Sequence, residues 1–197
     1  MHRFVLALTL VLSAAVALPA GAAKPVKWKM LGPMAAEVGG EALADDDLKA
    51  MKAADRCANA DKTWMRAMEP EQLTGIDELH EMLAAPVTCW SQAAKKAGKA
   101  SESLAPVAAY AGAQMAYSKT LREYMFALQA KAIGDRLNAC KRFKIAIAEA
   151  AKATEAVEGV VDGFTTVEAK TIAAEQAQNI KGVVDTVADE FSTQKCN

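Results

Sequence analysis

Residues 103–131 read SLAPVAAYAGAQMAYSKTLREYMFALQAK, and this segment decides the fold that the sequence predicts. Its larger side chains recur at alternating spacings of four and three residues, which places them in one seam along an α-helix. A seam of this kind, typical of coiled coils, is stable only when other helices cover it. We therefore predict a helical bundle. The seam consists of Tyr110, Gln114, Tyr117, Leu121, Tyr124 and Leu128.

The composition also favours helices. The chain has 197 residues, of which 52% are hydrophobic and 24% charged, enough for one domain with a real core. Alanine, the strongest helix former, supplies much of the apolar content, and runs of sheet-forming residues are nearly absent. We predict an all-α, up-and-down bundle of four to five helices with two disulfides over residues 41–197. The formal net charge of -1 provides no basic face for nucleic acid.

The first 23 residues have the pattern of a signal peptide. A basic start is followed by 15 apolar residues, Phe4 to Leu18, and then by the small residues Ala20, Gly21 and Ala22. Fifteen residues are fewer than the roughly 20 that a membrane-spanning helix needs. We therefore expect cleavage after this segment and export to a periplasm or to the medium.

Residues 24–40 are predicted to form a flexible arm, because they contain many helix-breaking residues. Trp28 stands in this segment between Lys27 and Lys29. Two hypotheses follow for Trp28: contact with a membrane surface or a partner, or packing back onto the bundle, which is the commoner outcome. The breaking residues are Pro25, Gly32, Pro33, Gly39 and Gly40.

Helix boundaries follow from capping residues and breakers. A first helix should begin at the acidic run 45–47, whose carboxylates favour a helix N-terminus, and end before Pro70. A second should begin near Thr74, with Pro86 either bending it or opening a further helix. Residues 165–168 resemble a capping box for the last helix. The sequence leaves open whether Gly134 marks a turn or lies within one long helix.

The four cysteines predict two disulfides. Cys57, Cys89, Cys140 and Cys196 are 32, 51 and 56 residues apart, which excludes the close pairs of zinc and haem-attachment motifs. Antiparallel helices bring together residues at equal distances from their turn. Position 73 is midway between the first two cysteines and position 168 midway between the last two, and both positions lie near expected turns. We predict the bonds Cys57–Cys89 and Cys140–Cys196, and the second requires a later turn or a tail that folds back.

One cluster has metal-ligating residue types. His80 is the only histidine beyond the expected signal peptide, and Asp77, Met82, Met65 and Met68 lie near it in sequence. Thioethers suit Cu(I), and a His/Met pair can hold haem iron, so a metal or haem carrier is an alternative hypothesis. A di-metal carboxylate site needs a second Asp/Glu-x-x-His pair, which this chain lacks.

The preferred functional hypothesis is a non-enzymatic structural or protein-binding role in the cell envelope, without a cofactor. One histidine provides no catalytic triad, and no glycine-rich phosphate loop is present. Tyr110, Tyr117 and Tyr124, with Trp28, are the candidate contacts for an unknown protein partner, although a core position is the commoner role for such a seam. A further alternative is binding to a membrane surface through Trp28 and the basic run 141–144.

Overall fold

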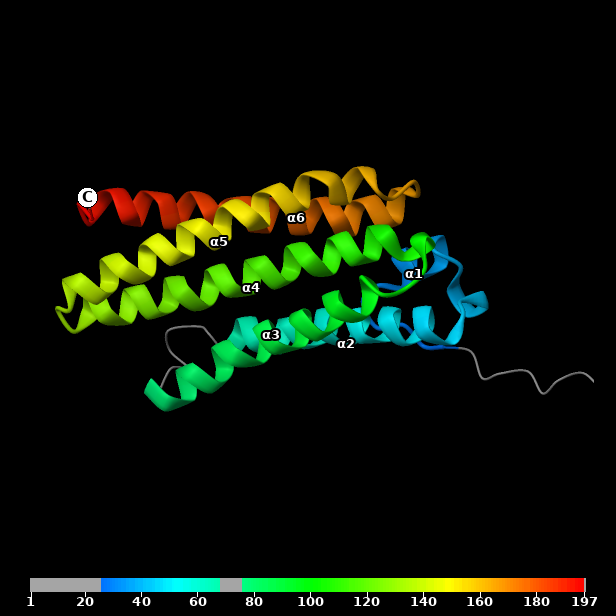
Figure 1. The fold of residues 1–197 in the computed structure, drawn as a ribbon, viewed down its shortest axis with the longest axis horizontal. Helices are drawn as coiled ribbons and strands as arrows, with labels where there is room; N and C mark the ends of the chain where they lie inside the picture. The colour runs from blue at the N-terminus through cyan, green and yellow to red at the C-terminus, as the bar shows by residue number, and fades with distance from the viewer. Residues whose placement is uncertain (1–25, 68–75, 197) are drawn as a thin grey trace, which may run out of the picture.

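A computed structural model describes residues 26–67 and 76–196, and within these ranges every regular element is a helix. The prediction of an all-helical bundle is confirmed (Figure 1). The expected signal peptide and the segment around Thr74 lie outside the described residues. The elements are α1 (Gly32–Glu37), the 3-10 turn η1 (Gly40–Ala42), α2 (Asp45–Ala67), α3 (Ile76–Ala97), η3 (Glu102–Leu104), α4 (Ala105–Ala132), α5 (Arg136–Asp162) and α6 (Val167–Thr193).

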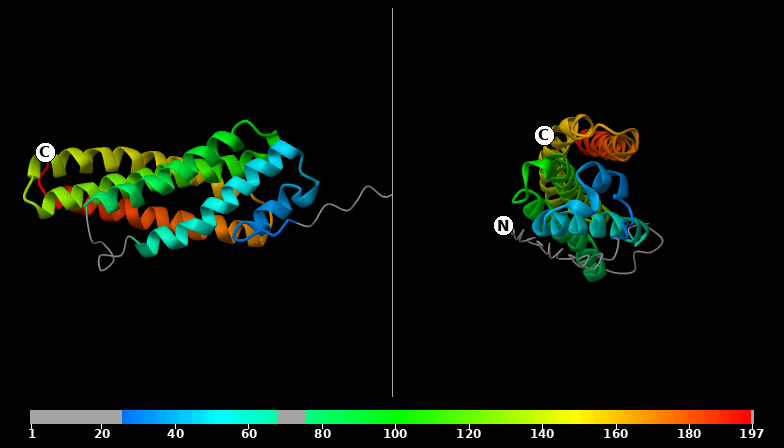
Figure 2. Two further views of the ribbon diagram at one scale, coloured as in Figure 1. Left: turned by 90° about the horizontal axis from the view of Figure 1, so that it is seen from below. Right: turned by 90° about the vertical axis from the view of Figure 1, so that its right-hand side faces the viewer.

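The bundle is built around α4, which contains the seam from which the fold was predicted. On one side α4 packs against α3, which in turn pairs with α2, and on the other side it packs along the whole of α5. Helix α6 covers α5 and touches α4 and α1 at fewer positions (Figures 1 and 2). Helix α6 therefore rests mainly on α5.

Gly134 marks a turn between two helices. Its φ of +77° is a left-handed conformation that glycine adopts without strain, and it follows the last residue of α4 by two positions. The Asp135 amide donates to the Ala130 carbonyl at 2.9 Å, and the Asp135 carboxylate accepts from the Asn138 amide at 3.0 Å to start α5. Of the two alternatives, the turn is the correct one.

Two prolines lie within helices, Pro106 at the start of α4 and Pro86 in the interior of α3. Pro106 occupies the first turn of α4, where a missing amide hydrogen costs nothing. Pro86 lies inside α3, and the helix continues on both sides of it, so Pro86 does not open a separate helix. Its ring is buried.

The flexible arm predicted for residues 24–40 is wrong for residues 26–40. Gly32 and Pro33 begin helix α1. Gly39, with a φ of +119°, lies between the end of α1 and the 3-10 turn η1. Leu31 and Met34 are completely buried in the main core, and Trp28 is half-buried against the same core. The glycines and prolines therefore shape a packed segment.

Asp55 of α2 holds the start of this segment. Its buried carboxylate accepts hydrogen bonds from three consecutive backbone amides, those of Lys29, Met30 and Leu31, at 2.8 to 3.2 Å. These amides precede α1 and have no helical acceptor, so the carboxylate replaces one.

Asp55→Ala is expected to lower the free energy of unfolding by about 2 kcal/mol, because buried amides would lose their acceptor. Urea unfolding followed by circular dichroism measures this change. The matched control is Asp46→Ala on the same helix, which removes an exposed ion pair with Lys49 and one of three first-turn carboxylates and should cost less than about 1 kcal/mol. Equal losses in the two variants would contradict the role assigned to Asp55.

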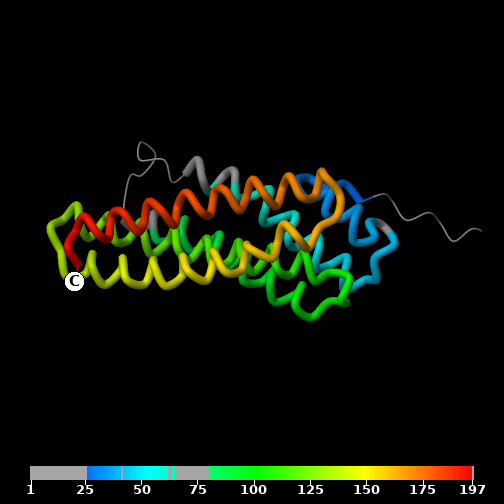
Figure 3. Tube along the Cα trace, turned by 90° about the horizontal axis from the view of Figure 1, so that it is seen from above, coloured from blue at the N-terminus to red at the C-terminus, as the bar shows by residue number. Residues whose placement is uncertain are grey.

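Glu37, the last residue of α1, ties this segment to α6. Its carboxylate accepts hydrogen bonds from the amides and hydroxyls of both Thr165 and Thr166. Burial alone would raise the pKa of Glu37, but the four hydrogen bonds together lower it to about 2. Thr166 also caps α6 by accepting from the Ala169 amide at 3.4 Å. Figure 3 shows α1 beside the start of α6.

Both predicted disulfides are present. Cys57–Cys89 joins α2 to α3 with Cα atoms 5.8 Å apart, and Cys140–Cys196 joins α5 to the chain after α6 with Cα atoms 5.3 Å apart. The second bond forms because the tail turns back after α6 through Lys195, which has a φ of +49°. Disulfides are typical of proteins in oxidising compartments, which agrees with export. Within the described ranges, no helix is long and apolar enough to cross a bilayer.

The acidic run at the start of α2 does more than favour the helix dipole. The Asp47 carboxylate accepts from the Ser101 amide at 2.9 Å and from the Ser101 hydroxyl at 2.5 Å. These hydrogen bonds lower the pKa of Asp47. Asp47 thus fixes the connection between α3 and α4 to α2, a role that the capping prediction did not include.

Candidate functional site

A cleft of about 460 Å³ separates α6 from the α2–α3 pair, with α4 as its floor. We call it the α2–α6 cleft. It forms because α6 lies on α5 and does not close onto α2 along its length. In the end-on view of Figure 2, α1 lies between α2 and the start of α6. The lining residues are Asp61, Trp64, Leu83, Pro86, Tyr117, Ser118, Leu121, Gln176, Gln178, Asn179, Gly182, Val183 and Thr186.

Apolar side chains from four helices form the walls of the cleft. Trp64 of α2, Leu83 of α3, Leu121 of α4 and Val183 of α6 contribute large hydrophobic surfaces. The space beside Gly182 on the α6 wall is open, because a Cβ atom built at this position has no neighbour within 4 Å. A mostly apolar cavity of this size with a few polar groups is typical of a small-molecule site.

Among the described residues that line the α2–α6 cleft, Asp61 is the charged one. Its two carboxylate oxygens lie 3.0 and 3.1 Å from the indole nitrogen of Trp90, which donates to them. Burial raises the pKa of Asp61 from 3.8 to about 6, and the hydrogen bond from Trp90 opposes part of that rise. Asp61 is therefore largely ionised at neutral pH, and it has no ion-pair partner among the described residues.

A hydrogen-bonded chain connects the floor of the cleft to α6. The Gln114 amide nitrogen donates to the Tyr110 hydroxyl at 3.0 Å, and the Gln176 amide nitrogen donates to the Gln114 oxygen at 3.1 Å. Tyr110 and Gln114 are buried, so these bonds form away from water and fix the position of Gln176 on α6. The Tyr110 ring also meets the Trp90 ring edge-on, with centroids 5.9 Å apart.

The cleft continues toward the N-terminal segment. An adjoining chamber of about 350 Å³ shares Asp61, Gln176 and Asn179 with it. Glu175 is the one further charged residue at this chamber, and no lysine or arginine is among the described residues that line either space. The remaining lining residues of the adjoining chamber are Met30, Leu31, Ala58, Tyr110 and Ile172.

The tyrosines singled out from the sequence lie mostly inside the bundle. Tyr110 and Tyr117 are 4% and 9% exposed, and Tyr124 is half-buried near Phe143, with ring centroids 6.1 Å apart. Tyr117 is the one that reaches the α2–α6 cleft, where burial and the negative charge of Asp61 raise its pKa to about 12. Trp28 lines a separate surface hollow of about 410 Å³ beside Asp55. Their contact with a protein partner stays a prediction.

The metal hypothesis concerns another part of the molecule. His80 is exposed and its ring lies against Phe126 of α4, with centroids 4.3 Å apart, while Met82 is half-buried. No group of three histidine, cysteine, aspartate or glutamate side chains converges anywhere in the described part of the chain. The side chains of Asp77 and Met65, and the whole of Met68, lie outside that part.

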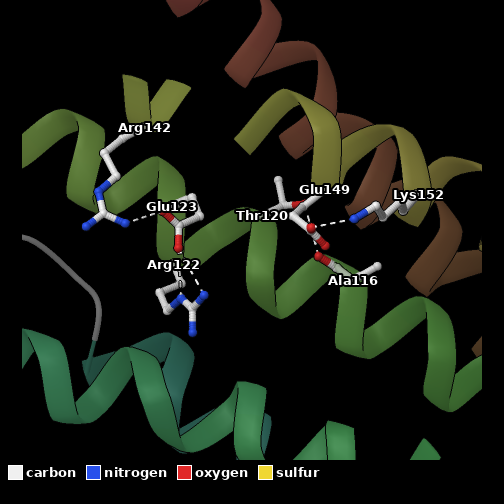
Figure 4. A network of polar contacts seen from close by, with 7 residues as sticks. All are labelled: Ala116, Thr120, Arg122, Glu123, Arg142, Glu149 and Lys152. Atoms are coloured by element: carbon white, nitrogen blue, oxygen red, sulfur yellow. Dashed lines mark hydrogen bonds and ion pairs between the residues drawn. The ribbon is translucent and has the colours of Figure 1, made fainter. Parts of the chain in front are cut away.

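A buried carboxylate near His80 has a structural role. Glu123 is 3% exposed and pairs with Arg142 at 2.7 Å and with Arg122 at 3.0 Å, so that it joins α4 to α5 (Figure 4). The Arg142 guanidinium also lies 5.2 Å from the centre of the Phe126 ring. In the basic run 141–144, Phe143 is fully buried, and Lys141 and Lys144 are exposed.

Asp61 was not singled out from the sequence, although a signal was present. Cys57, Asp61 and Trp64 follow one another at spacings of four and three, so they share one face of α2. The predicted bond Cys57–Cys89 implies that this face of α2 lies against the helix that contains Cys89, which is α3. A carboxylate on a face that a disulfide holds inside is unusual and indicates a function for it.

These features define a class: a disulfide-linked helical bundle with an open, mostly apolar cleft in which a carboxylate has no ion-pair partner among the described residues. Comparison with protein-family models, with curated proteins and with solved structures found no match. The site itself is therefore the basis for a functional proposal.

Proposed function

We propose that this protein is an exported, non-enzymatic binding protein of the cell envelope that holds its ligand in the α2–α6 cleft. The observation that supports the proposal is the cleft itself, about 460 Å³ of mostly apolar space between α6 and the α2–α3 pair. An open cleft lined by apolar side chains exposes hydrophobic surface to water, and covering such surface with an apolar ligand is favourable.

The other functional hypotheses have less support from the described residues. The proposed partner contacts Tyr110 and Tyr117 are buried. His80 packs against Phe126 and is not among the described residues that line the cleft. Catalysis by a hydroxyl of the cleft would need a base such as histidine or lysine to activate it, and neither type is among the described residues that line the cleft.

Closing the cleft should abolish binding. We expect Gly182→Leu to fill the space beside α6 and to lower affinity for a neutral aromatic probe, the N-acetyl derivative of dansylcadaverine, at least tenfold. Enhanced dansyl fluorescence on titration of the oxidised protein reports binding.

The matched control is Gly159→Leu on α5, where a built Cβ atom likewise has no neighbour within 4 Å and the position is outside the cleft. Gly159→Leu should bind the probe as the unmodified protein does. Absence of saturable binding by the unmodified protein, or equal binding by Gly182→Leu, would contradict the proposal.

A further inference from the structure

We propose that the α2–α6 cleft selects an organic ammonium ion, an apolar body with one positively charged amine, through a direct ion pair with Asp61. This inference rests on the proposed function and specifies its ligand class. It assigns to the cleft a charge preference that its apolar walls alone would not produce.

The first support is the incomplete pairing of Asp61. A carboxylate offers about four acceptor positions on its two oxygens, and one donor, the Trp90 indole, contacts both of them. Asp61 has no ion pair among the described residues. Asp55, six residues earlier, accepts from three amides and illustrates how this fold satisfies a carboxylate that has only a structural role.

The second support is the charge of the surroundings. Among the described residues, the charged side chains that line the cleft and the adjoining chamber are Asp61 and Glu175, and none of these lining residues is a lysine or an arginine. An anionic ligand would meet these carboxylates without a compensating cation, whereas an ammonium ion would neutralise Asp61. Charge complementarity therefore favours a cation.

The third support is the arrangement of the walls around the charge. Trp64 and Tyr117 offer aromatic surfaces in the same cleft as Asp61, and aromatic faces attract organic cations. Leu83 and Leu121 supply hydrophobic surface for an apolar body. Such walls offer no ligands to a metal ion, and Asp61 alone does not provide enough of them.

Few titratable groups surround Asp61. Tyr110 and Tyr117 approach from α4, and burial raises the pKa of both hydroxyls well above neutral pH. Glu175 approaches from α6 at the adjoining chamber, and Trp90 of α3 does not titrate. Burial raises the pKa of Asp61 to about 6, so among these groups Asp61 is the one that titrates between pH 5 and pH 7.5.

The test compares two probes that differ in one charge. Dansylcadaverine carries a primary ammonium group, and its N-acetyl derivative keeps the same aromatic body and is neutral at that end. We expect the unmodified protein at pH 7.5 to bind the ammonium probe roughly tenfold more tightly than the neutral one. In Asp61→Asn, and in the unmodified protein at pH 5, this preference should fall to less than twofold.

A second variant separates Asp61 from the general negative charge of the region. Glu175→Gln should keep most of the preference, because Glu175 lines only the adjoining chamber. If Asp61→Asn keeps the tenfold preference, or if both probes bind equally to the unmodified protein, the charge selection is wrong and the binding function stands. If neither probe binds, the proposed function fails as well.

Discussion

Replacing both Cys57 and Cys89 with alanine is expected to lower the free energy of unfolding by about 4 kcal/mol. The bond closes a loop between residues 32 positions apart, and losing it releases the unfolded chain from that constraint. It also frees α2, which otherwise packs mainly against α3, to move away from the bundle. Urea unfolding of both proteins without reductant measures the difference.

The second disulfide provides the comparison. The corresponding alanine pair at Cys140 and Cys196 should cost a similar amount, because its loop of 56 residues is only moderately larger on a logarithmic scale. The two variants should differ in ligand binding. Loss of Cys57–Cys89 should weaken probe binding, because Asp61 lies one turn beyond Cys57 on α2. A loss below about 1 kcal/mol in both variants would contradict this account.

The effect of Asp61→Asn on the free energy of unfolding is expected to depend on pH. Going from pH 4 to neutral pH, the variant should gain up to about 3 kcal/mol relative to the unmodified protein. Burial raises the pKa of Asp61 from 3.8 in the unfolded chain to about 6 in the fold. Between these values the folded state binds more protons than the unfolded state, so stability falls as pH rises through this range. Asparagine keeps an acceptor for Trp90 and removes that penalty.

Urea unfolding of the unmodified protein and of Asp61→Asn at pH 4 and pH 7.5 tests this sign. The control is Asp46→Asn, because the Asp46 side chain is 89% exposed and should produce little difference between the two pH values. If Asp61→Asn gains no stability relative to the unmodified protein between pH 4 and pH 7.5, the pKa of Asp61 is not raised in the fold.

Much of the fold could be predicted from the sequence because local signals specify it. The seam through Tyr110 and Tyr117 identified α4, and Pro106 marked its start. The cysteine positions, set against the turns, gave both disulfide pairings. Gly134 could not be resolved by sequence alone, because one glycine costs a helix only about 1 kcal/mol.

The N-terminal segment and the cleft could not be predicted, because both depend on contacts between distant residues. Gly32 and Pro33 suggest a loop locally, whereas the burial of Leu31 and the hydrogen bonds that backbone amides donate to Asp55 hold the segment in place. The cleft exists because α6 packs onto α5 and leaves α2 uncovered, a choice of helix neighbour that no periodicity within α6 reveals. Asp61 becomes a candidate ligand-binding residue only because it lines that cleft.

The contact between Glu37 and the start of α6 has a consequence for how the chain acquires its structure. Thr165 lies 128 residues after Glu37, so this contact can form only when most of the chain has been synthesised. Segments joined over such distances are fixed late, since closing a long loop is slow. Helix α1 precedes every other helix described here, yet its docking against α6 must await them. Maturation of the cleft would then be a late folding event, completed when α1 bridges α2 and α6.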